Sequence, residues 1–423
     1  MDLLFVVDSL SAVAGANVSI VRTLTKVLKK RDCKIYILAK MDCKRPVSED
    51  IIKEFDEVYL LPSDKVEIIP NLYKRVKTNN RFLKETLWLL NHPGILFKGI
   101  DGIVGNAYFV RKEFTRMINR ICAVRNIDAV IGVSSPYSIA RAVSKANIKA
   151  TKILYQLDPF TNNYTLSNKG KRKRRQIERQ TIEGLDMLFM PDFIKDDIVK
   201  SNIYPNCKKL IEANLPGIIM DQVDQFNHAL EYSPSTDKVN FVFAGRMYKD
   251  IRNPRMLFQL FTFLPDNYVL HILGSGCEKE IAEFKTILGE RLIYHGLVAK
   301  KIADQHIEMA DVLVNIDNTI KNQMPSKIVD YICRQKRIVN VCSDSECLAA
   351  KLLSSYPNGI NVCVDENNMG ESAKSVVEFM NNKIEIVTTK EILDKYKKYS
   401  DYYVADTFLG AINEFIRAQE NQS

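Results

Sequence analysis

The sequence has 423 residues, too many for one ordinary core, and at roughly 150 residues per domain it predicts two or three domains, with two as the working count. Its composition, with 46% hydrophobic and 26% charged residues, is globular and excludes an intrinsically disordered chain. The net charge of +9 permits an anionic substrate or surface but selects neither. No apolar run reaches the roughly 20 residues of a membrane-spanning helix, and residues 1–8 show no secretory signal, so we expect a cytoplasmic protein.

The start of the chain predicts a β-α-β unit. Residues 3–7 are a short apolar run, typical of a strand buried on both faces of a parallel sheet. A loop containing Gly15 follows, and from Asn17 the apolar residues recur at helical spacing. Residues 34–39 then predict a second strand.

The alternation of strands and helices continues through both halves of the chain. Further strand candidates are residues 129–133, 152–157, 187–190, 239–244, 268–273, 292–294, 312–316 and 338–341. Helical patterns separate most of these runs, among them a long polar helix at residues 171–183. The pattern predicts an α/β protein with two Rossmann-like, doubly wound domains that face a cleft.

Domain boundaries follow from a polar stretch in the middle of the chain. We predict an N-terminal domain at residues 1–218, a linker or crossing at 219–237, and a C-terminal domain at 238–395. Residues 396–423 include a helical pattern with apolar positions such as Phe408. We expect these last helices to pack back across the junction onto the N-terminal domain.

Cysteine and histidine spacing does not indicate a metal site. The nine cysteines contain no Cys-x-x-Cys pair and are interpreted as reduced core thiols. The five histidines are His92, His228, His271, His295 and His306. A zinc site would need tight Cys/His spacing, which these positions do not supply. The sequence therefore predicts no bound metal.

Glycines and cations follow two of the strands in the second half. Gly245 ends one strand and is followed by Arg246, Lys249 and Arg252, while Gly274 ends the next strand. Glycine allows close approach of a ligand, and guanidinium groups form paired hydrogen bonds to phosphate oxygens. Because ligands of open α/β sheets bind beyond the carboxyl ends of strands, this loop suits a diphosphate, although a solvated basic loop is the alternative.

A third segment predicts an anion site at a helix start. Pro325 is placed where a helix would begin, and Ser326 and Lys327 follow it. The free N–H groups and the positive dipole end of such a helix favour an anion, to which Lys327 adds a charge. Asp330 lies one turn deeper on the face of Ser326 and suits ribose hydroxyls. The alternative is a capped surface helix.

Taken together, these motifs resemble the C-terminal domain of glycosyltransferase family 4, which has the GT-B fold. The resemblance is carried by residues 243–246 (Phe-Ala-Gly-Arg), 252–254 (Arg-Asn-Pro), 272–276 (Ile-Leu-Gly-Ser-Gly), 294–298 (Tyr-His-Gly-Leu-Val), 310–314 (Ala-Asp-Val-Leu-Val) and 324–331 (Met-Pro-Ser-Lys-Ile-Val-Asp-Tyr). Only residues 240–345 carry it specifically, and the N-terminal half is a looser match.

The resemblance implies roles for individual residues. Arg246 resembles the first phosphate-binding cation of the family, and Arg252 falls where the second is expected, with Lys249 as the competing candidate. The two glutamates that the family often carries correspond here to Asn322 and Asp330. Asn322 lacks the charge of the first glutamate, so the sequence departs from the family pattern at the position expected to contact the donor sugar. This variant resembles the Pro-Ser-Lys subgroup of bacterial capsular and exopolysaccharide transferases.

The implied chemistry is transfer of a sugar from a nucleoside diphosphate, with UDP expected before GDP. The sequence contains no Asp-x-Asp motif. Arg246, Arg252, Lys327 and the helix start at Pro325 would therefore stabilise the leaving diphosphate without a metal or other cofactor. The resemblance implies retention of the anomeric configuration through front-face attack. His295 and Gly296, after a strand, are candidates for donor contacts, with a plain turn as the alternative.

The acceptor side is assigned to the N-terminal domain. Gly15, Ala16 and Asn17 are expected to bring the backbone near the donor, and Asp158, at the end of a strand, is the candidate catalytic polar group on this side. The acceptor would be a glycan or a lipid-linked glycan of cell-surface polysaccharide biosynthesis. The basic run 169–175 and residues 74–97 would dock on an anionic membrane, on the inner face of the cell membrane.

Two alternatives to a glycosyltransferase (hexosyltransferase type, EC 2.4) remain open at this point. One is a GT-B-like sugar-nucleotide epimerase, which would need an acid/base set and an acidic pair that we do not find. The other is a non-catalytic nucleotide- or nucleic-acid-binding protein. Residues 10–18 contain one glycine in place of a Gly-x-Gly-x-x-Gly motif, and the basic run lacks interleaved aromatic residues, so no nucleic-acid partner is expected.

Overall fold

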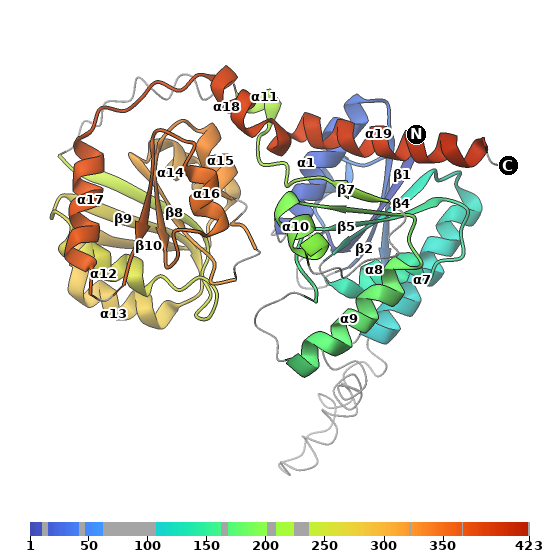
Figure 1. The fold of residues 1–423 in the computed structure, drawn as a ribbon, viewed down its shortest axis with the longest axis horizontal. Coiled ribbons are helices and arrows are strands. Elements are labelled where there is room, and N and C mark those ends of the chain that lie inside the picture. Colours follow the sequence, from blue (N-terminus) through green and yellow to red (C-terminus); the bar gives the residue numbers. More distant parts are fainter. Residues whose placement is uncertain are drawn as a thin grey trace, which may run out of the picture. The chain divides into compact units, whose positions relative to one another are not determined.

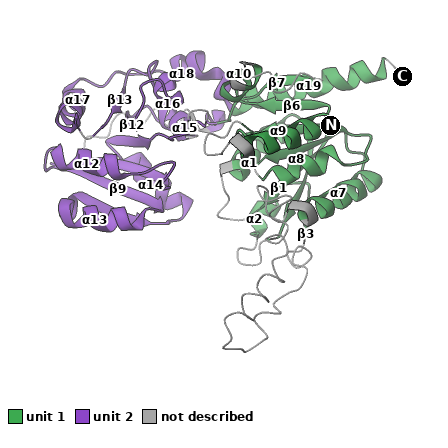
Figure 2. Ribbon diagram, turned by 60° about the horizontal axis from the view of Figure 1, so that its bottom comes forward, with its two compact units in different colours: residues 1–216, 401–423 green, residues 217–400 purple. Residues whose placement is uncertain are grey.

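The structure, a computed structural model, describes most of the chain as two compact units (Figures 1 and 2). It does not describe residues 11–15, 42–46, 62–106, 135, 162–167, 201–208, 224–236, 321–322, 326, 366 and 422–423. The first unit combines Met1–Pro216 with Asp401–Ser423, and the second is Gly217–Ser400. The predicted segment 74–97 therefore lies outside the described residues.

The first unit is built on a parallel sheet whose seven strands have the order β3-β2-β1-β4-β5-β6-β7. The strands are β1 (Asp2–Ser9), β2 (Lys34–Lys40), β3 (Glu57–Leu61), β4 (Ala129–Ser134), β5 (Thr151–Gln156), β6 (Met187–Met190) and β7 (Leu210–Glu212). The central strand β4 is buried along its whole length. Helices on both faces explain why its sequence is continuously apolar rather than alternating.

Helices cover both faces of this sheet. Alternate residues of β1 belong to different cores: Leu3 and Phe5 pack with α1 and α19, whereas Leu4 and Val6 pack with α7 and α8. The helices of this unit are α1 (Ala16–Lys30), α2 (Glu49–Ile52), α7 (Ala107–Val124), α8 (Tyr137–Ser144), α9 (Asn168–Ile182), α10 (Asp192–Lys200) and α19 (Asp401–Glu420).

The C-terminal helix α19 completes the core of the first unit. Phe408 is fully buried, stacks on Phe189 with ring centroids 4.1 Å apart, and meets Tyr155 edge-on at 5.0 Å. At the surface, Asp406 of the same helix forms an ion pair with Arg31, the residue that follows α1. The prediction that the C-terminal helix returns to the N-terminal domain is confirmed.

The second unit repeats the architecture with a six-stranded parallel sheet of order β10-β9-β8-β11-β12-β13. Its strands are β8 (Val239–Arg246), β9 (Tyr268–Ser275), β10 (Leu292–Gly296), β11 (Val312–Ile316), β12 (Arg337–Cys342) and β13 (Gly359–Cys363). Its helices are α11 (Met220–Val223), α12 (Arg255–Phe263), α13 (Glu278–Leu288), η3 (Gly289–Arg291), α14 (Lys300–Met309), α15 (Lys327–Cys333), α16 (Leu348–Leu353), α17 (Met369–Asn381), α18 (Thr389–Tyr396) and η4 (Lys397–Tyr399).

The strand order of each sheet marks where a ligand binds in this class of fold. In both sheets the first two connections run outward to one edge, and the chain then returns beside the first strand and runs to the other edge. In such folds ligands bind beyond the carboxyl ends of the strands at this reversal, which here lies between β1 and β4 and between β8 and β11. None of the described helices has the length and apolar character needed to cross a bilayer.

Candidate functional site

The carboxyl ends of β8 and β9 form a tip made of glycine backbone. Gly245 and Gly274 are register partners, and Gly274 has a φ of +143°. A Cβ atom at Gly274 would lie 1.8 Å from the Gly245 carbonyl oxygen, so this pairing requires glycine. The structure thus brings together two predicted site residues, Gly245 and Gly274, and neither has a side chain that would cover the backbone.

A short turn after β8 is attached to the loop after β11. The N–H of Tyr248 donates to the Arg252 carbonyl at 3.1 Å, and the N–H of Arg252 donates back to the Tyr248 carbonyl at 2.8 Å. Thr319 ties this turn to the neighbouring loop, because its N–H donates to the Ile251 carbonyl and its hydroxyl to the Asp250 carbonyl. The loops beyond β8 and β11 therefore form one structure at the predicted ligand edge.

Arg252 lies within this structure. Its Nε donates to the Asn318 side-chain oxygen at 3.1 Å, and a guanidinium nitrogen lies 3.8 Å from the position of a Cβ on Gly245. Burial lowers the pKa of Arg252, an effect partly offset by the nearby Tyr331 and Asp317. Since arginine stays charged even so, the tip gains a positive charge held in a fixed orientation.

Two more cations at this edge are exposed. The guanidinium of Arg246 lies over the Tyr248 ring, 5.3 Å from its centroid, and Lys249 is exposed on the turn. Neither forms a salt bridge with another described residue. Both are available to an anionic ligand, in contrast to Arg255, which is paired with Glu283 at 2.9 Å.

A carboxylate that sequence reasoning missed lies beside the same edge. Glu278, in the first turn of α13, accepts a hydrogen bond from the Gly276 N–H at 2.8 Å. Backbone hydrogen bonds from Gly276 and from Glu278 itself lower the pKa of this carboxyl. The Glu278 carboxylate thus already binds the backbone N–H of the turn after β9. The sequence clue to this contact was the placement of Glu278 two residues after Gly276.

Helix α15 packs against the same tip from the other side. The Ala244 N–H points to the Tyr331 hydroxyl at 3.4 Å, which fixes α15 beside the carboxyl end of β8. Lys327 is exposed at the helix start, and the buried Pro325 accepts from the Ile328 N–H at 3.2 Å. Asn322 and Ser326 lie outside the described residues.

Asp330 has a partner that sequence reasoning did not anticipate. Arg334, whose side chain is 7% exposed, lies 3.3 Å from the Asp330 carboxylate. The same guanidinium pairs with Glu308 and lies 3.7 Å from Asp304, both on α14. Arg334, held by two carboxylates of α14, therefore orients the Asp330 carboxylate. A ligand that bound Asp330 would do so while this carboxylate also contacts Arg334.

In the first unit, the predicted acceptor residues lie at the carboxyl ends of strands. The Asn17 side chain donates to the Ser134 carbonyl at the end of β4, at 3.0 Å. Asp158 is half-buried just after β5. Ala16 is the first residue of α1, and Gly15 lies outside the described residues.

A buried polar cluster near Asp158 was not predicted from the sequence. Gln156 donates to Glu178 at 3.0 Å, and Glu178 is 1% exposed. Burial and the Glu178 charge raise the pKa of Tyr137 well above its usual range. Arg174 folds inward over the Phe160 ring, 4.9 Å from the centroid, so one member of the basic run 169–175 is not a freely solvated cation. The sequence feature that could have indicated this cluster is Gln156, a polar residue at the end of a largely apolar strand.

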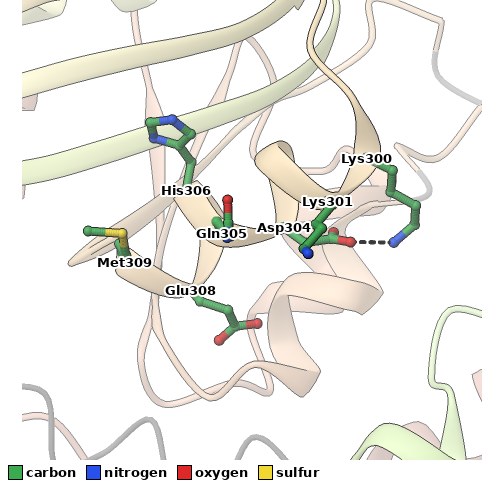
Figure 3. Close-up of a pocket in the computed structure, with 7 residues that line it drawn as sticks. All are labelled: Lys300, Lys301, Asp304, Gln305, His306, Glu308 and Met309. Atoms are coloured by element: carbon green, nitrogen blue, oxygen red, sulfur yellow. Dashed lines mark hydrogen bonds and ion pairs between the residues drawn. The ribbon is translucent and has the colours of Figure 1, made fainter.

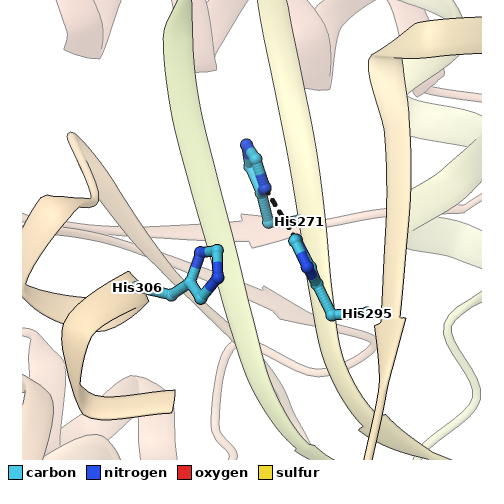
Figure 4. Close-up of side chains that lie close together, drawn as sticks. All are labelled: His271, His295 and His306. Carbon is cyan, nitrogen blue, oxygen red and sulfur yellow. Dashed lines mark hydrogen bonds between the residues drawn. The ribbon is translucent and has the colours of Figure 1, made fainter. Parts of the chain in front are cut away.

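His295 lies in β10, next to Tyr294, whose hydroxyl donates to the Gly274 carbonyl at 3.3 Å. Its Nε2 is 3.0 Å from Nδ1 of His271, and His306 of α14 completes a group whose ligand atoms all lie within 4.8 Å of one another (Figure 4). Among the described residues, these three histidines are the one group of potential ligands close enough together to hold a metal ion. Gly296, with a φ of +69°, ends β10 immediately after His295.

A surface hollow runs along α14. Seven residues of this helix line it: Lys300, Lys301, Asp304, Gln305, His306, Glu308 and Met309 (Figure 3). Asp304 pairs with Lys300 at 2.6 Å on one side of the hollow. The lining contains none of the predicted site residues, but it includes the two carboxylates that hold Arg334.

The two units, each a doubly wound parallel sheet with helices on both faces, and the returning α19 define the GT-B fold. No protein-family model matches the chain, and no curated protein matches its sequence. The fold is nevertheless shared along the full length of several solved structures.

One similar structure is sucrose-phosphate synthase from Thermosynechococcus elongatus, with a TM-score of 0.63, 10% identity, and coverage of 99% of this chain and 100% of that one. Another is HepE from Anabaena, solved with UDP and glucose, with a TM-score of 0.57, 11% identity and full coverage of both chains. A third is UDP-GlcNAc 2-epimerase from Neisseria meningitidis bound to UDP-GlcNAc, with a TM-score of 0.56, 8% identity, and coverage of 98% and 100%. At these identities the likeness establishes the fold.

Proposed function

We propose that this protein is a glycosyltransferase that takes a sugar from a nucleoside diphosphate sugar, with UDP as the nucleotide. The observation that carries the proposal is the glycine tip of Gly245 and Gly274 with Arg246, Lys249 and Arg252 around it. Bare backbone and cations at the carboxyl edge of a doubly wound sheet suit a diphosphate. Similar folds solved with UDP and glucose, and with UDP-GlcNAc, support UDP.

The leaving diphosphate would be stabilised by protein cations. Cleavage of the bond between sugar and phosphate leaves a dianion, whose charge must be compensated in the transition state. Arg246 and Arg252 would contact it from the β8 side and Lys327 from α15, with no metal required for this step. We propose that the sugar is transferred with retention of configuration, through front-face attack.

The other predicted donor residues have subsidiary roles in this proposal. Asp330 would accept hydrogen bonds from the ribose, since an ionised carboxylate has about four lone-pair sites and Arg334 occupies only part of that capacity. Pro325 and Ser326 would bring the backbone of the α15 start near the phosphates, and Asn322 would face the sugar. Family 4 and its Pro-Ser-Lys subgroup remain the proposed affiliation.

The acceptor is proposed to be a glycan or lipid-linked glycan of cell-surface polysaccharide biosynthesis. Asp158 would activate its hydroxyl, and residues 15–17 would line its approach. Basic residues of α9 would dock on the anionic inner face of the cell membrane, where clustered lysine and arginine are attracted to acidic lipids.

The donor site is tested by nucleotide binding in the presence of a chelator. UDP is expected to raise the melting temperature of the wild-type protein with EDTA present, because the proposed clamp uses no metal. Combined substitution Arg246→Ala and Lys327→Ala should abolish the shift. Arg255→Ala is the matched control, since Arg255 is a nearby arginine at the start of α12 that is paired with Glu283. Absence of a shift with any nucleoside diphosphate would reject the donor site.

A sugar-nucleotide epimerase is the second candidate, because solved structures named as UDP-N-acetylglucosamine 2-epimerases share the fold. The two activities differ in their products. A transferase incubated with donor and acceptor releases the nucleoside diphosphate and elongates the acceptor, whereas an epimerase converts one nucleotide sugar into another without an acceptor. Chromatography of the nucleotide sugars after incubation without acceptor would separate the two.

A further inference from the structure

Three histidines from separate elements converge on one face of the second sheet. His271 lies in β9, His295 in the neighbouring β10 and His306 in α14. Leu270 and Ile272 belong to the core on the other face, so the alternation of the strand turns His271 toward the face on which the three rings gather (Figure 4). Each histidine is partly exposed, and a ligand could reach the group from solvent.

The hydrogen bonds around His271 determine which of its nitrogens is free to bind. Asn240 donates its side-chain N–H2 to Asp311 at 3.3 Å, which leaves its oxygen facing His271 Nε2 at 3.2 Å. Nε2 must then carry the proton and donate to that oxygen. The lone pair is consequently on Nδ1, which points at His295 Nε2. A hydrogen-bond partner that fixes the tautomer through the other ring nitrogen, as Asn240 does here, is characteristic of metal-binding histidines.

The spacing of the rings fits a small tetrahedral ion. With Zn–N bonds of about 2.0–2.1 Å, two imidazole nitrogens on one tetrahedral zinc are about 3.3 Å apart. The observed separation of His271 Nδ1 and His295 Nε2 is 3.0 Å, and all three ligand atoms fall within 4.8 Å. A ring rotation at His306 and small shifts of the others would bring the three nitrogens onto one ion, replacing a single hydrogen bond.

We propose that His271, His295 and His306 bind a divalent transition-metal ion of the Zn²⁺ class. Three imidazoles without a carboxylate favour zinc over magnesium or calcium, which prefer oxygen ligands. The three protein ligands leave a fourth position open, and His306 also lines the hollow along α14, which offers a path of entry.

The ion would fasten α14 to the edge of the sheet. Helix α14 also carries Asp304 and Glu308, which hold Arg334 and through it Asp330 of α15. Fixing the position of α14 would therefore fix the orientation of Asp330. The role is one of positioning, separate from the chemistry of the diphosphate, and the site itself does not depend on the proposed function.

The test uses untagged full-length protein freed of metal by a chelator. We expect one equivalent of Zn²⁺ to bind in competition with a chromophoric chelator, and to raise the melting temperature where Mg²⁺ does not. Co²⁺ in the same site should show the visible absorption of tetrahedral coordination. His306→Ala should lose stoichiometric binding, His306→Cys should retain it through the thiolate, and Gln305→Ala, an exposed neighbour on α14, should match the wild type.

Two results would overturn the proposal. One is wild-type affinity for Zn²⁺ equal to that of His306→Ala. The other is a Zn²⁺ affinity that is unchanged in Asn240→Ala as well as in His306→Ala. Asn240→Ala is expected to weaken the affinity about 10- to 100-fold, because the hydrogen bond that fixes the His271 tautomer is lost. Circular dichroism of each variant establishes that it is folded. The UDP-induced thermal shift, measured with EDTA, reports on the donor site independently of this result.

Discussion

Gly274 is the residue whose replacement should be least tolerated at the proposed donor site. Gly274→Ala would force a side chain into a positive-φ position and set its Cβ 1.8 Å from the Gly245 carbonyl oxygen. The strained backbone costs about 1–3 kcal/mol before the clash is relieved by separation of β8 and β9. We expect a lower urea midpoint and a loss of UDP binding.

The control for this substitution is Gly370→Ala in α17, where an added Cβ meets nothing within 4 Å. Alanine stabilises a helix relative to glycine, so this variant should match or exceed the wild-type stability by up to about 1 kcal/mol. If the two variants had equal urea midpoints and equal UDP affinity, the glycine tip would have no special structural role.

The protonation of His271 predicts how stability depends on pH. Its pKa is about 4 in the folded chain, against 6.5 for the ordinary group. Between these values the unfolded state holds the proton and the folded state does not, so stability falls as the pH drops from 6.5 toward 4. In metal-free protein, the melting temperature of His271→Gln should fall less steeply over this interval. Parallel curves for the two proteins would contradict the assignment.

Among the elements, α19 makes a measurable contribution to a core far from it in sequence. Phe408→Ala removes a fully buried ring that contacts Phe189 and Tyr155. A cavity of this kind costs about 3–5 kcal/mol. Urea unfolding of the first unit should show this loss, whereas Asn413→Ala, exposed on the same helix, should change stability by no more than about 0.5 kcal/mol. A loss below 1 kcal/mol for Phe408→Ala would mean that α19 packs only loosely.

The elements themselves were largely predictable from the sequence. Strands buried on both faces must be continuously apolar, and runs such as residues 129–133 stand out for that reason. The start of α15 followed from Pro325, which suits the first turn of a helix. Short edge strands such as β3 and β7 were missed, because an edge strand needs less apolar sequence and β7 has three residues.

At the scale of the whole molecule, the fold class was predictable, and the pairings between distant residues were not. Repeated β-α-β patterns specify doubly wound sheets through connection rules that apply to any such chain. His271 and His295, by contrast, are 24 residues apart in sequence and meet because β9 and β10 are neighbours. The link from Asp330 through Arg334 to α14 likewise depends on packing, which a pattern along the chain does not encode.

The first unit is made from both ends of the chain, and this has a consequence for its synthesis. A ribosome completes residues 1–216 before it makes Gly217–Ser400, and only afterwards α19. At about 5–20 residues per second, the face of the sheet that receives Phe408 stays uncovered for roughly 10 to 40 seconds. The nascent N-terminal unit is thus left with exposed apolar surface while the second unit is translated, a window in which chaperone binding would protect it from aggregation.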